Sequence, residues 1–363
     1  MPCKRKRWPK GRNMLNVAIL GAGIGAQHLA AYQALPHLFR VVALVDKDQT
    51  RAEALRGTHD FLITPDWNGV FARPDIDLID ICLPPHLHLP VTLEALAAGK
   101  NAICEKPLAT SLAGVEQIAQ TAKRHNRKVY PVFQYRWGRS CAQLRHLQRA
   151  DLLGQPLVAA LETHWSRDST YYDVPWRGTW AGEQGGAVLG HAIHAHDLLT
   201  HFMGPVRAVS AVTTTRVNPI ETEDCAALTF EMANGALATS NITLGAATDE
   251  TRLRFVFEKL TVTSGSNPYA PGTSDWSFMA RDPNDQPDID HALTKTPDEA
   301  SGFTGFLAAI ADDLAGRPSG AVSLADGAAS IELVSAVYHS ARSGARVSLP
   351  LSSAHPLFNG WIP

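Results

Sequence analysis

Short apolar runs alternate with stretches of helical periodicity over the first part of the chain. An apolar run at residues 15–20 ends in glycines, a helical pattern extends over 24–35 until Pro36, and a second apolar run covers 41–45. Further strands are expected at 78–83, 101–104 and 128–133, and further helices at 87–98 and 111–125. Because parallel strands need crossover connections, this alternation predicts an α/β fold with a doubly wound parallel sheet.

The pattern changes near residue 136, where helical periodicity gives way to β-type runs. A helix at 142–153 and a strand at 157–164 come first, and the runs that follow cover 206–215, 226–230, 236–242 and 253–262. Turns such as Ala233-Asn234-Gly235 predict hairpins, and hence an α+β domain with an open, mostly antiparallel sheet. Residues 267–299 are rich in Pro, Asp, Asn and Ser and are expected to form a long loop. Helices at 302–314 and 325–343 are expected to pack back against the domain junction.

Three small residues follow the first strand in the spacing of a dinucleotide-binding turn. Gly21 permits a tight turn, Gly23 lets the main chain approach a pyrophosphate, and Ala26 is expected to let the helix pack closely on the strand. Asp46 ends the next strand, where a carboxylate can accept hydrogen bonds from the adenosine ribose. The turn residues Ile24 and Gly25 join Gly21, Gly23 and Asp46 as predicted cofactor contacts. The pattern predicts a Rossmann domain that binds NAD, with NADP less favoured because Asp46 would repel a 2′-phosphate.

Length and composition agree with two globular domains. The chain has 363 residues, of which 45% are hydrophobic and 19% charged. We predict a dinucleotide-binding Rossmann domain at 14–135 and a substrate-binding and oligomerisation domain at 136–363. Residues 1–13 are predicted to be a disordered basic tail, and Met14 is an alternative start because the first strand follows it directly.

Charge and cysteine content favour a small-molecule partner in the cytoplasm. Thirty-three basic and 35 acidic residues give a net charge of -2, which offers no broad surface for nucleic acid or a membrane. The basic residues of the tail are a weaker alternative nucleic-acid patch; they are Lys4, Arg5, Lys6, Arg7, Lys10 and Arg12. The five cysteines are widely spaced and are expected to be reduced thiols.

Three further motifs follow the glycine turn: Pro84-Pro85 with His88 after a strand, the triplet Glu105-Lys106-Pro107, and a glycine-rich stretch that leads from Gly185 into His194-Ala195-His196-Asp197. Together with the glycine turn, these motifs resemble those of the glucose-fructose oxidoreductase and inositol dehydrogenase family, also called Gfo/Idh/MocA. The resemblance covers essentially residues 14–350. It implies an oxidoreductase that forms a homodimer or homotetramer, with Pro84, His88, Glu105, Lys106 and Gln134 near the cofactor.

The resemblance implies that Lys106 and His194 flank the reacting carbon of the substrate. Oxidation of a secondary alcohol needs a base, and an imidazole with a reference pKa of about 6.5 is suited to that task, so we predict His194 as the general base. The Lys106 ammonium would stabilise the developing alkoxide and could pass on the proton, so that Lys106 and His194 together handle it. Asp197 lies one helical turn after His194 and is predicted to orient the imidazole or hold a substrate hydroxyl.

One position departs from the family pattern. The family usually carries Asp or Asn four residues before the catalytic histidine, whereas this chain has Gly190, followed by His191. Because residues three apart share a helix face, His191 is predicted to take over part of substrate binding or proton transfer.

Aromatic and charged residues at 171–180 resemble a loop that many sugar-handling members place over the substrate. Aromatic faces stack on the C–H surfaces of sugars, so Tyr172 and Trp176 are predicted substrate contacts, and Arg177 is predicted to bind hydroxyls. Together the motifs predict a dehydrogenase that interconverts a ring secondary alcohol and a ketone on a sugar, glycoside or cyclitol.

Several alternatives stay open at this level. Lys106 and His194 could be structural residues, and the histidines between 191 and 201 could form a metal cluster, although their spacing matches no known zinc signature. On the same scaffold, tightly bound NAD could serve a lyase or glycoside-cleaving reaction. The chain could also be a non-catalytic sensor that binds a dinucleotide.

Overall fold

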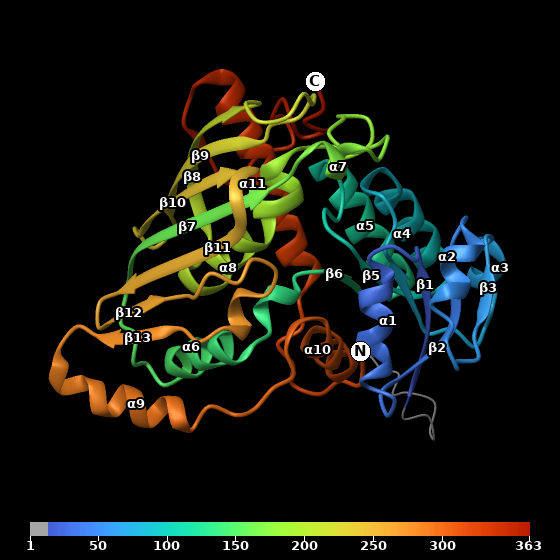
Figure 1. Ribbon diagram of the computed structural model, residues 1–363, viewed down its shortest axis with the longest axis horizontal. Helices are drawn as coiled ribbons and strands as arrows, with labels where there is room; N and C mark the ends of the chain where they lie inside the picture. Colours follow the sequence, from blue (N-terminus) through green and yellow to red (C-terminus); the bar gives the residue numbers. More distant parts are fainter. Residues whose placement is uncertain (1–13) are drawn as a thin grey trace, which may run out of the picture.

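The computed structural model describes residues 14–363 and arranges them around two sheets (Figure 1). The first sheet has six parallel strands in the order β3-β2-β1-β4-β5-β6. Its strands are β1 (Leu15–Leu20), β2 (Phe39–Val45), β3 (Leu62–Thr64), β4 (Leu78–Ile81), β5 (Asn101–Cys104) and β6 (Val129–Pro131). This order is that of a doubly wound dinucleotide-binding sheet, so the predicted fold class of the first half is confirmed.

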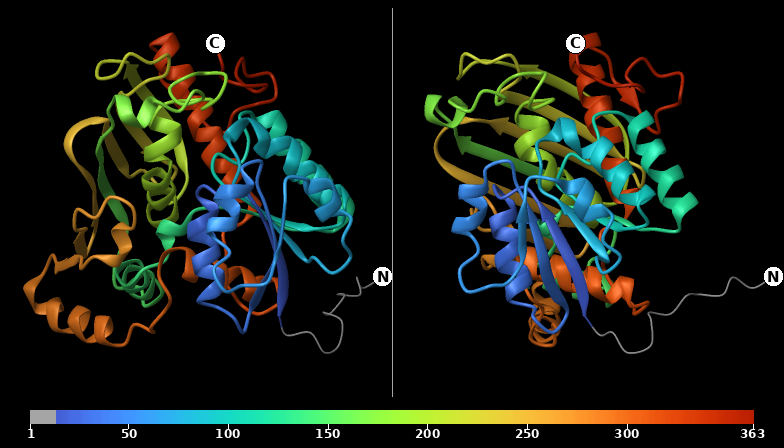
Figure 2. Two further views of the ribbon diagram at one scale, coloured as in Figure 1. Left: turned by 45° about the vertical axis from the view of Figure 1, so that its right-hand side comes forward. Right: turned by 90° about the vertical axis from the view of Figure 1, so that its right-hand side faces the viewer.

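Helices cover both faces of the first sheet, which explains why nearly all residues of its central strands β1 and β4 are buried (Figure 2). The helices of this half are α1 (Gly25–Gln33), α2 (Gln49–Ala54), α3 (Trp67–Phe71), α4 (His88–Ala97) and α5 (Leu112–His125). The sequence patterns missed β3, α2 and α3, because each has six residues or fewer and shows too little periodicity.

The second sheet has eight strands in the order β13-β12-β11-β7-β10-β9-β8-β14. Its strands are β7 (Pro156–Ser166), β8 (Val206–Thr214), β9 (Cys225–Met232), β10 (Leu237–Thr243), β11 (Gly245–Phe257), β12 (Leu260–Thr263), β13 (Ser277–Ala280) and β14 (Val347–Ser348). All neighbours pair antiparallel except β7 and β10, which confirms the open, mostly antiparallel sheet. The single run predicted at 253–262 is in fact the hairpin of β11 and β12.

Helices cover one face of the second sheet and connect it to the first half. They are α6 (Arg139–Arg149), α7 (Ser169–Tyr172), α8 (Ile193–Met203), α9 (Gln286–Thr294), α10 (Gly302–Leu314) and α11 (Leu324–Ser343). Helix α11 contributes Val334 to the core of the first half and Val337 to the core of the second. Helix α10 packs against α1, so the C-terminal helices do lie at the junction, as expected (Figures 1 and 2).

The prediction of one long loop at 267–299 is wrong, because this stretch contains β13 and α9. Strand β13 has only four residues, of which Phe278 and Ala280 face the core. Helix α9 begins after a proline-containing turn and buries only Ile289, so its polar composition hid its helical pattern.

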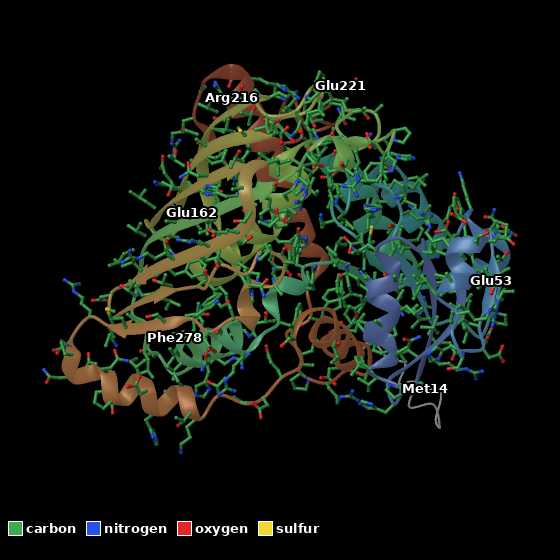
Figure 3. All side chains as sticks on the ribbon, viewed as in Figure 1. Met14, Glu53, Glu162, Arg216, Glu221 and Phe278 are labelled. Atoms are coloured by element: carbon green, nitrogen blue, oxygen red, sulfur yellow. The ribbon has the colours of Figure 1, made fainter. Side chains whose placement is uncertain are left out.

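The face of the second sheet that points away from the helices is exposed. Val158, Val212, Leu237 and Met279 are each exposed, and Glu162 of β7 lies on the same sheet in Figure 3. None of the helices within residues 14–363 is both long enough and apolar enough to cross a membrane. The cysteines of the described range are free, and three of the four are buried. The predicted basic tail lies outside that range.

Candidate active site

The predicted cofactor residues meet at the carboxyl edge of the first sheet. The strand order reverses between β1 and β4, and a doubly wound sheet binds its ligand in the crevice at that point. Gly21 directly follows β1, Lys106 follows β5, and the short turn of Gln134 follows β6. Residues far apart in sequence are therefore brought to one edge by the parallel arrangement of the strands.

The three glycines of the turn lie in different surroundings, so a side chain would have a different effect at each of them. Gly21 has a φ of +102°, and a Cβ there would lie 2.3 Å from the carbonyl oxygen of Cys82. At Gly23 a Cβ would meet nothing within 4 Å, so this position is open. The close approach of helix to strand occurs at Gly25, where a Cβ would lie 3.0 Å from the Ile19 side chain. This corrects the assignment of that role to Ala26, which is only half-buried, and makes Gly25 a packing residue.

Asp46 closes the glycine turn from the end of β2. One carboxylate oxygen accepts from the Ala22 N–H at 2.6 Å, and the other accepts from the Asp48 N–H at 2.8 Å. The half-exposed Arg51 side chain donates to both oxygens, at 2.9 and 3.0 Å. Burial alone would raise the pKa of Asp46, but these donors outweigh it and lower the pKa, so the group is a carboxylate at neutral pH.

Glu105 is buried and contacts an interior histidine, while its predicted cofactor contact stays a prediction. Its Oε1 lies 3.1 Å from Nε2 of His28, whose Nδ1 lies 2.8 Å from Asp80. Tyr32 donates to the same Asp80 oxygen at 2.9 Å. Burial lowers the pKa of His28, but Asp80 outweighs it and raises the pKa well above its usual value. The hydrogen bond and charge of His28 in turn override burial and lower the pKa of Glu105 to about 2.

His88 contacts main-chain carbonyls through both ring nitrogens, and its predicted cofactor contact stays a prediction. Its Nδ1 lies 2.6 Å from the carbonyl oxygen of Pro107, and its Nε2 lies 2.7 Å from that of Leu83. The ring therefore connects the segment after β4 with the segment that carries Lys106. Pro84, which starts a short 3₁₀ turn (η1, Pro85–Leu87), remains half-exposed at the crevice.

Lys106 reaches across to the second half of the molecule. Its Nζ donates to the carbonyl oxygen of Gly190 at 2.7 Å. Gly190 lies in a π-helical turn (Val188–Ala192) that leads into α8, and such turns release main-chain carbonyls from the helical pattern. Burial lowers the pKa of Lys106, while the charges of Glu105 and Glu183 oppose that shift.

The glycine-rich entry to this turn is required by close packing. A Cβ on Gly186 would lie 1.9 Å from the carbonyl oxygen of Glu223. The Glu223 side chain accepts from the N–H groups of Gly186 and Val188, at 3.2 and 3.0 Å, and from the Tyr338 hydroxyl at 3.0 Å. Burial raises the pKa of Glu223 to about 7. These contacts fix the start of the turn and so place Gly190 beside Lys106.

His194 lies close to Lys106 on the first turn of α8. Its ring stacks on Tyr135, with centroids 4.4 Å apart, and its Nδ1 is buried without a hydrogen-bond partner in the described part of the chain. Burial and the charge of Lys106 lower the pKa of His194 to about 3. The imidazole is therefore neutral at physiological pH.

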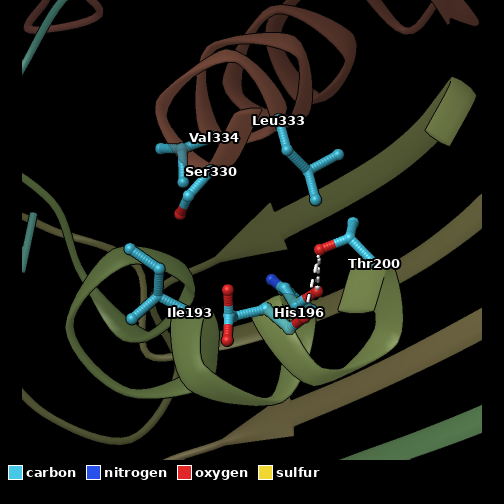
Figure 4. A pocket seen from close by; sticks show the side chains of 7 residues that line it. Ile193, His196, Thr200, Ser330, Leu333 and Val334 are labelled. Atoms are coloured by element: carbon cyan, nitrogen blue, oxygen red, sulfur yellow. Dashed lines mark hydrogen bonds between the residues drawn. The ribbon is translucent and has the colours of Figure 1, made fainter. Parts of the chain in front are cut away.

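The predicted contact between Asp197 and His194 is absent. Both Asp197 oxygens accept from the buried guanidinium of Arg136, at 2.6 and 2.8 Å, and Arg136 also donates to Asp326 of α11 at 2.9 Å. Asp197 lines a small gap between α8 and α11, whose volume of about 10 Å³ suits at most one water molecule; Figure 4 shows this gap with its labelled lining residues. Arg136 and Asp197 thus connect α8 with α11 through buried ion pairs.

The predicted aromatic loop comes close to His191, but the residue that approaches it is Tyr171 and not the predicted Tyr172. The hydroxyl of Tyr171, rather than Tyr172, lies 3.4 Å from Nε2 of His191. Arg177 lies over the Tyr171 ring, 3.9 Å from its centroid, and 5.0 Å from that of Trp176. Burial, and then the nearby cations, lower the pKa of His191 well below its usual value. Tyr172 packs edge-on against Tyr171 at 5.0 Å.

Sequence reasoning missed three residues at this end of the site. Tyr171 is the chain neighbour of the predicted Tyr172, and nothing in the sequence distinguished the two tyrosines. Arg167 lies over the rings of Trp165 and Tyr171, at 5.0 Å from each centroid. Glu183 is buried and interacts electrostatically with Lys106 and Arg177. No motif or spacing in the sequence marked Arg167 or Glu183.

Both halves of the chain match family models. Residues 15–133 match the GFO/IDH/MocA model described as an oxidoreductase family with an NAD-binding Rossmann fold. Residues 141–263 match the model of the GFO/IDH/MocA C-terminal domain. The two matches support the resemblance drawn from the motifs.

Named relatives and solved structures agree with these matches. The chain is 31% identical to levoglucosan dehydrogenase of Pseudarthrobacter phenanthrenivorans over 55% of this chain and 54% of that protein. It is 33% identical to inositol 2-dehydrogenase of Acidothermus cellulolyticus over 40% of this chain and 44% of that one. The alignments thus span about half of these curated relatives. The WlbA dehydrogenase of Chromobacterium violaceum, solved with NADH and UDP-GlcNAcA, is 26% identical, with a TM-score of 0.83 over 95% of this chain and 98% of that chain.

Proposed function

The chain belongs to the Gfo/Idh/MocA family of oxidoreductases, and on that premise we propose that it is an NAD-dependent dehydrogenase. Its reaction interconverts a ring secondary alcohol and a ketone on a sugar, glycoside or cyclitol. The observation that carries this proposal is the meeting of Lys106 with Gly190 and His194 at the carboxyl edge of the Rossmann sheet. That arrangement puts two groups able to exchange protons beside the crevice where a dinucleotide fits.

The residues present fit NAD. Gly23 leaves open space at the start of α1, where main-chain N–H groups and the helix dipole favour a pyrophosphate. Asp46 is ionised at the end of β2 and can accept from ribose hydroxyls. Oε1 of Gln134 is buried without a partner within the described residues, so it can accept a hydrogen bond from a ligand. Gly21, Gly23, Ile24, Asp46 and Gln134 would hold the group, and Pro84 would line it.

When bound, the nicotinamide supplies the two-electron acceptor for oxidation of the alcohol. Lys106, in its neutral form, accepts the hydroxyl proton, because burial lowers its pKa from 10.5 and makes the free amine more accessible. His194 is neutral, with a pKa of about 3, and is a weak base. We therefore revise the roles: His194 positions the hydroxyl by a hydrogen bond, and Lys106 carries the proton.

The aromatic loop is proposed to cover the sugar. Tyr171, Trp176 and Arg177 form one stacked group, and His191 extends it toward Gly190. Stacked rings suit the C–H face of a sugar, and the guanidinium suits its hydroxyls. The ring carbon that reacts must be identified from the structure of the reaction product.

We also propose a homo-oligomer formed through the exposed face of the second sheet. Val158 and Leu237 are direct neighbours in the pairing of β7 and β10, and both point outward. Exposed apolar residues grouped on a flat sheet favour association. Light scattering on the purified protein should give at least twice the monomer mass of 39.2 kDa.

The central test is a panel of inositols, hexoses, anhydrosugars, glycosides and nucleotide sugars, assayed with NAD and NADP by absorbance of the reduced nicotinamide. A substrate that reduces NAD supports the proposal. Product formed without net reduction would support the lyase with bound cofactor, and silence despite NAD binding would support the sensor. Failure to bind either dinucleotide would overturn the proposal.

A further inference from the structure

Gly190 leaves an opening in the site beside Lys106. A Cβ at this position would point toward one side chain, that of Glu183, whose Oε1 would lie 3.8 Å away. Apart from the chain neighbours of Gly190 and the backbone of its own helical turn, no other heavy atom of residues 14–363 lies within 4 Å of that point. The main-chain oxygen of the same residue holds Nζ of Lys106 at 2.7 Å. The opening therefore faces the carboxylate of Glu183, and the amine of Lys106 is held by the main-chain oxygen of the same residue.

Only one oxygen of Glu183 is used by the fold. Its Oε2 accepts from the Gly178 N–H at 2.6 Å, which holds the end of the aromatic loop. Its Oε1, which faces the opening, has no hydrogen bond to any residue that the structure describes. The residue as a whole is only 8% exposed, but Oε1 is not among its fully enclosed atoms, so this oxygen can be reached from the opening. A ligand that displaces water from the opening must bring a donor, because a carboxylate oxygen buried without one is unfavourable.

The surrounding charges restrict what that ligand can be. Lys106 and Arg177 both interact electrostatically with Glu183. The guanidinium of Arg177, and Lys106 before it loses its proton, would repel an ammonium group of the ligand, and the carboxylate itself would repel an anion at the same point. A neutral hydroxyl is the donor that this environment accepts. His191, whose Nδ1 is buried without a partner in the described range, provides a second polar group in the adjacent residue.

We propose that Glu183 is a substrate-binding residue, whose Oε1 accepts a hydrogen bond from a neutral hydroxyl that enters the opening at Gly190. The hydroxyl belongs to the carbon next to the one that reacts, since the opening adjoins Lys106. This inference rests on the proposed function and narrows it: the substrate is uncharged at that position, so a ring with a hydroxyl there is preferred over one with a carboxylate.

Two variants test the proposal, and both use the full-length protein. Glu183→Gln keeps an oxygen for the Gly178 N–H but removes the charge. Gly190→Ala leaves Glu183 unchanged and puts a methyl group into the opening at an ordinary contact distance. The matched control is Glu221→Gln, because Glu221 is exposed and accepts from the Trp180 N–H of the same loop at 2.9 Å (Figure 3).

We expect KM for the substrate to rise about 10- to 100-fold in Glu183→Gln, because a hydrogen bond to a charged group is lost. Gly190→Ala should raise KM as well, whereas kcat should fall less than KM rises in both variants. The dissociation constant of NADH, measured by fluorescence, should stay unchanged. In Glu221→Gln all of these constants should match the wild type.

Deoxy analogues of the substrate identify the hydroxyl. The analogue that lacks the hydroxyl bound by Glu183 should bind wild type and Glu183→Gln equally, whereas the parent substrate should discriminate between them. An unchanged KM in Gly190→Ala, or discrimination that persists with every deoxy analogue, would overturn the inference. Absence of turnover by the wild type with any compound would instead contradict the proposed function, so the two failures are distinguishable.

Discussion

The proposed dinucleotide side of the site is made mainly of main chain, whereas the proposed substrate side is made of side chains from separate segments. Gly21 and Gly23 act through the backbone they permit, within a few residues of each other. Lys106, Glu183 and His194 come from different elements and meet only in the folded protein. The two sides also differ electrostatically, because the substrate side holds buried groups with shifted pKa values. The comparison teaches that a main-chain site is encoded locally, while a side-chain site depends on tertiary packing.

The largest effect should come from removing the proton-handling side chains without touching the main-chain side. Lys106→Ala should lower kcat about 1000-fold, because general base catalysis contributes roughly 10²- to 10⁴-fold. His194→Ala should lower kcat by a smaller factor. NADH affinity should change little in either variant, because the glycine turn is intact. Lys123→Ala, a change of an exposed lysine on α5, is the matched control.

The pH profile separates the two residues. Burial lowers the pKa of Lys106, so kcat/KM for alcohol oxidation should rise with pH and level off as the amine loses its proton, below pH 10.5. His194, with a pKa of about 3, stays neutral over the working range and should add no step. A rising limb that survives in Lys106→Ala would show that another group carries the proton.

The next largest effect should be on the free energy of unfolding. It should follow from replacing His28, which is buried on α1, the helix that begins after the glycine turn. His28→Gln should lower the free energy of unfolding by about 3 kcal/mol, because it leaves Asp80 and Glu105 buried without their cation. Urea unfolding at several pH values checks this. His37→Gln, an exposed histidine, is the control.

The pH dependence of this loss has a defined sign. The pKa of Glu105 is lowered from 4.5 to about 2, so its contribution is present above pH 4.5 and is lost as pH falls toward 2. The pKa of His28 is raised above 6.5, so its contribution is complete below pH 6.5 and is lost only at higher pH, as its folded pKa is passed. The difference between wild type and His28→Gln should therefore be largest near pH 5 to 6. An equal difference at all pH values would contradict the charged pair.

The contrast between main-chain and side-chain parts of the site also explains which features could be predicted from the sequence. The parallel sheet and its long helices followed from periodicity, because burial on both faces of β1 and β4 requires apolar runs. The glycine turn and Asp46 followed from a short motif whose spacing matches a defined backbone shape. Within this motif the packing role was assigned to Ala26, whereas its neighbour Gly25 makes the close contact.

Side-chain partners could not be predicted in the same way. Asp197 has the spacing to face His194, but both of its carboxylate oxygens accept hydrogen bonds from the buried Arg136, which lies 61 residues earlier in the chain. Glu105 and His88 are in recognisable motifs, yet each turns toward an interior partner that no local pattern reveals. Glu183 carries no motif at all, and only the fold places it beside Gly190.

A smaller effect is expected from Asp46, which is the one side chain central to the dinucleotide side. Asp46→Ala should weaken NADH binding about 10- to 100-fold, because a charged acceptor for the ribose is lost. It also frees Arg51 from its contact at 2.9 Å, so NADP should bind better than to the wild type. Fluorescence titration with both cofactors measures this, with Glu53→Ala on exposed α2 surface as the control (Figure 3). An unchanged preference for NAD would mean that Asp46 does not face the ribose.

The smallest effect on the protein itself should come from Gly23→Ala. A Cβ there meets nothing within 4 Å, and the φ of Gly23 is not in the left-handed region, so the melting temperature should stay the same or rise slightly. NADH affinity should nevertheless fall about tenfold, because the methyl group takes the space that the pyrophosphate needs. Gly21→Ala gives the opposite pattern: its Cβ would lie 2.3 Å from the Cys82 carbonyl, so it should destabilise the fold with or without ligand. If Gly23→Ala bound NADH as tightly as the wild type, the open main chain at this turn would not be where the dinucleotide lies, and the contrast between the two sides of the site would fail.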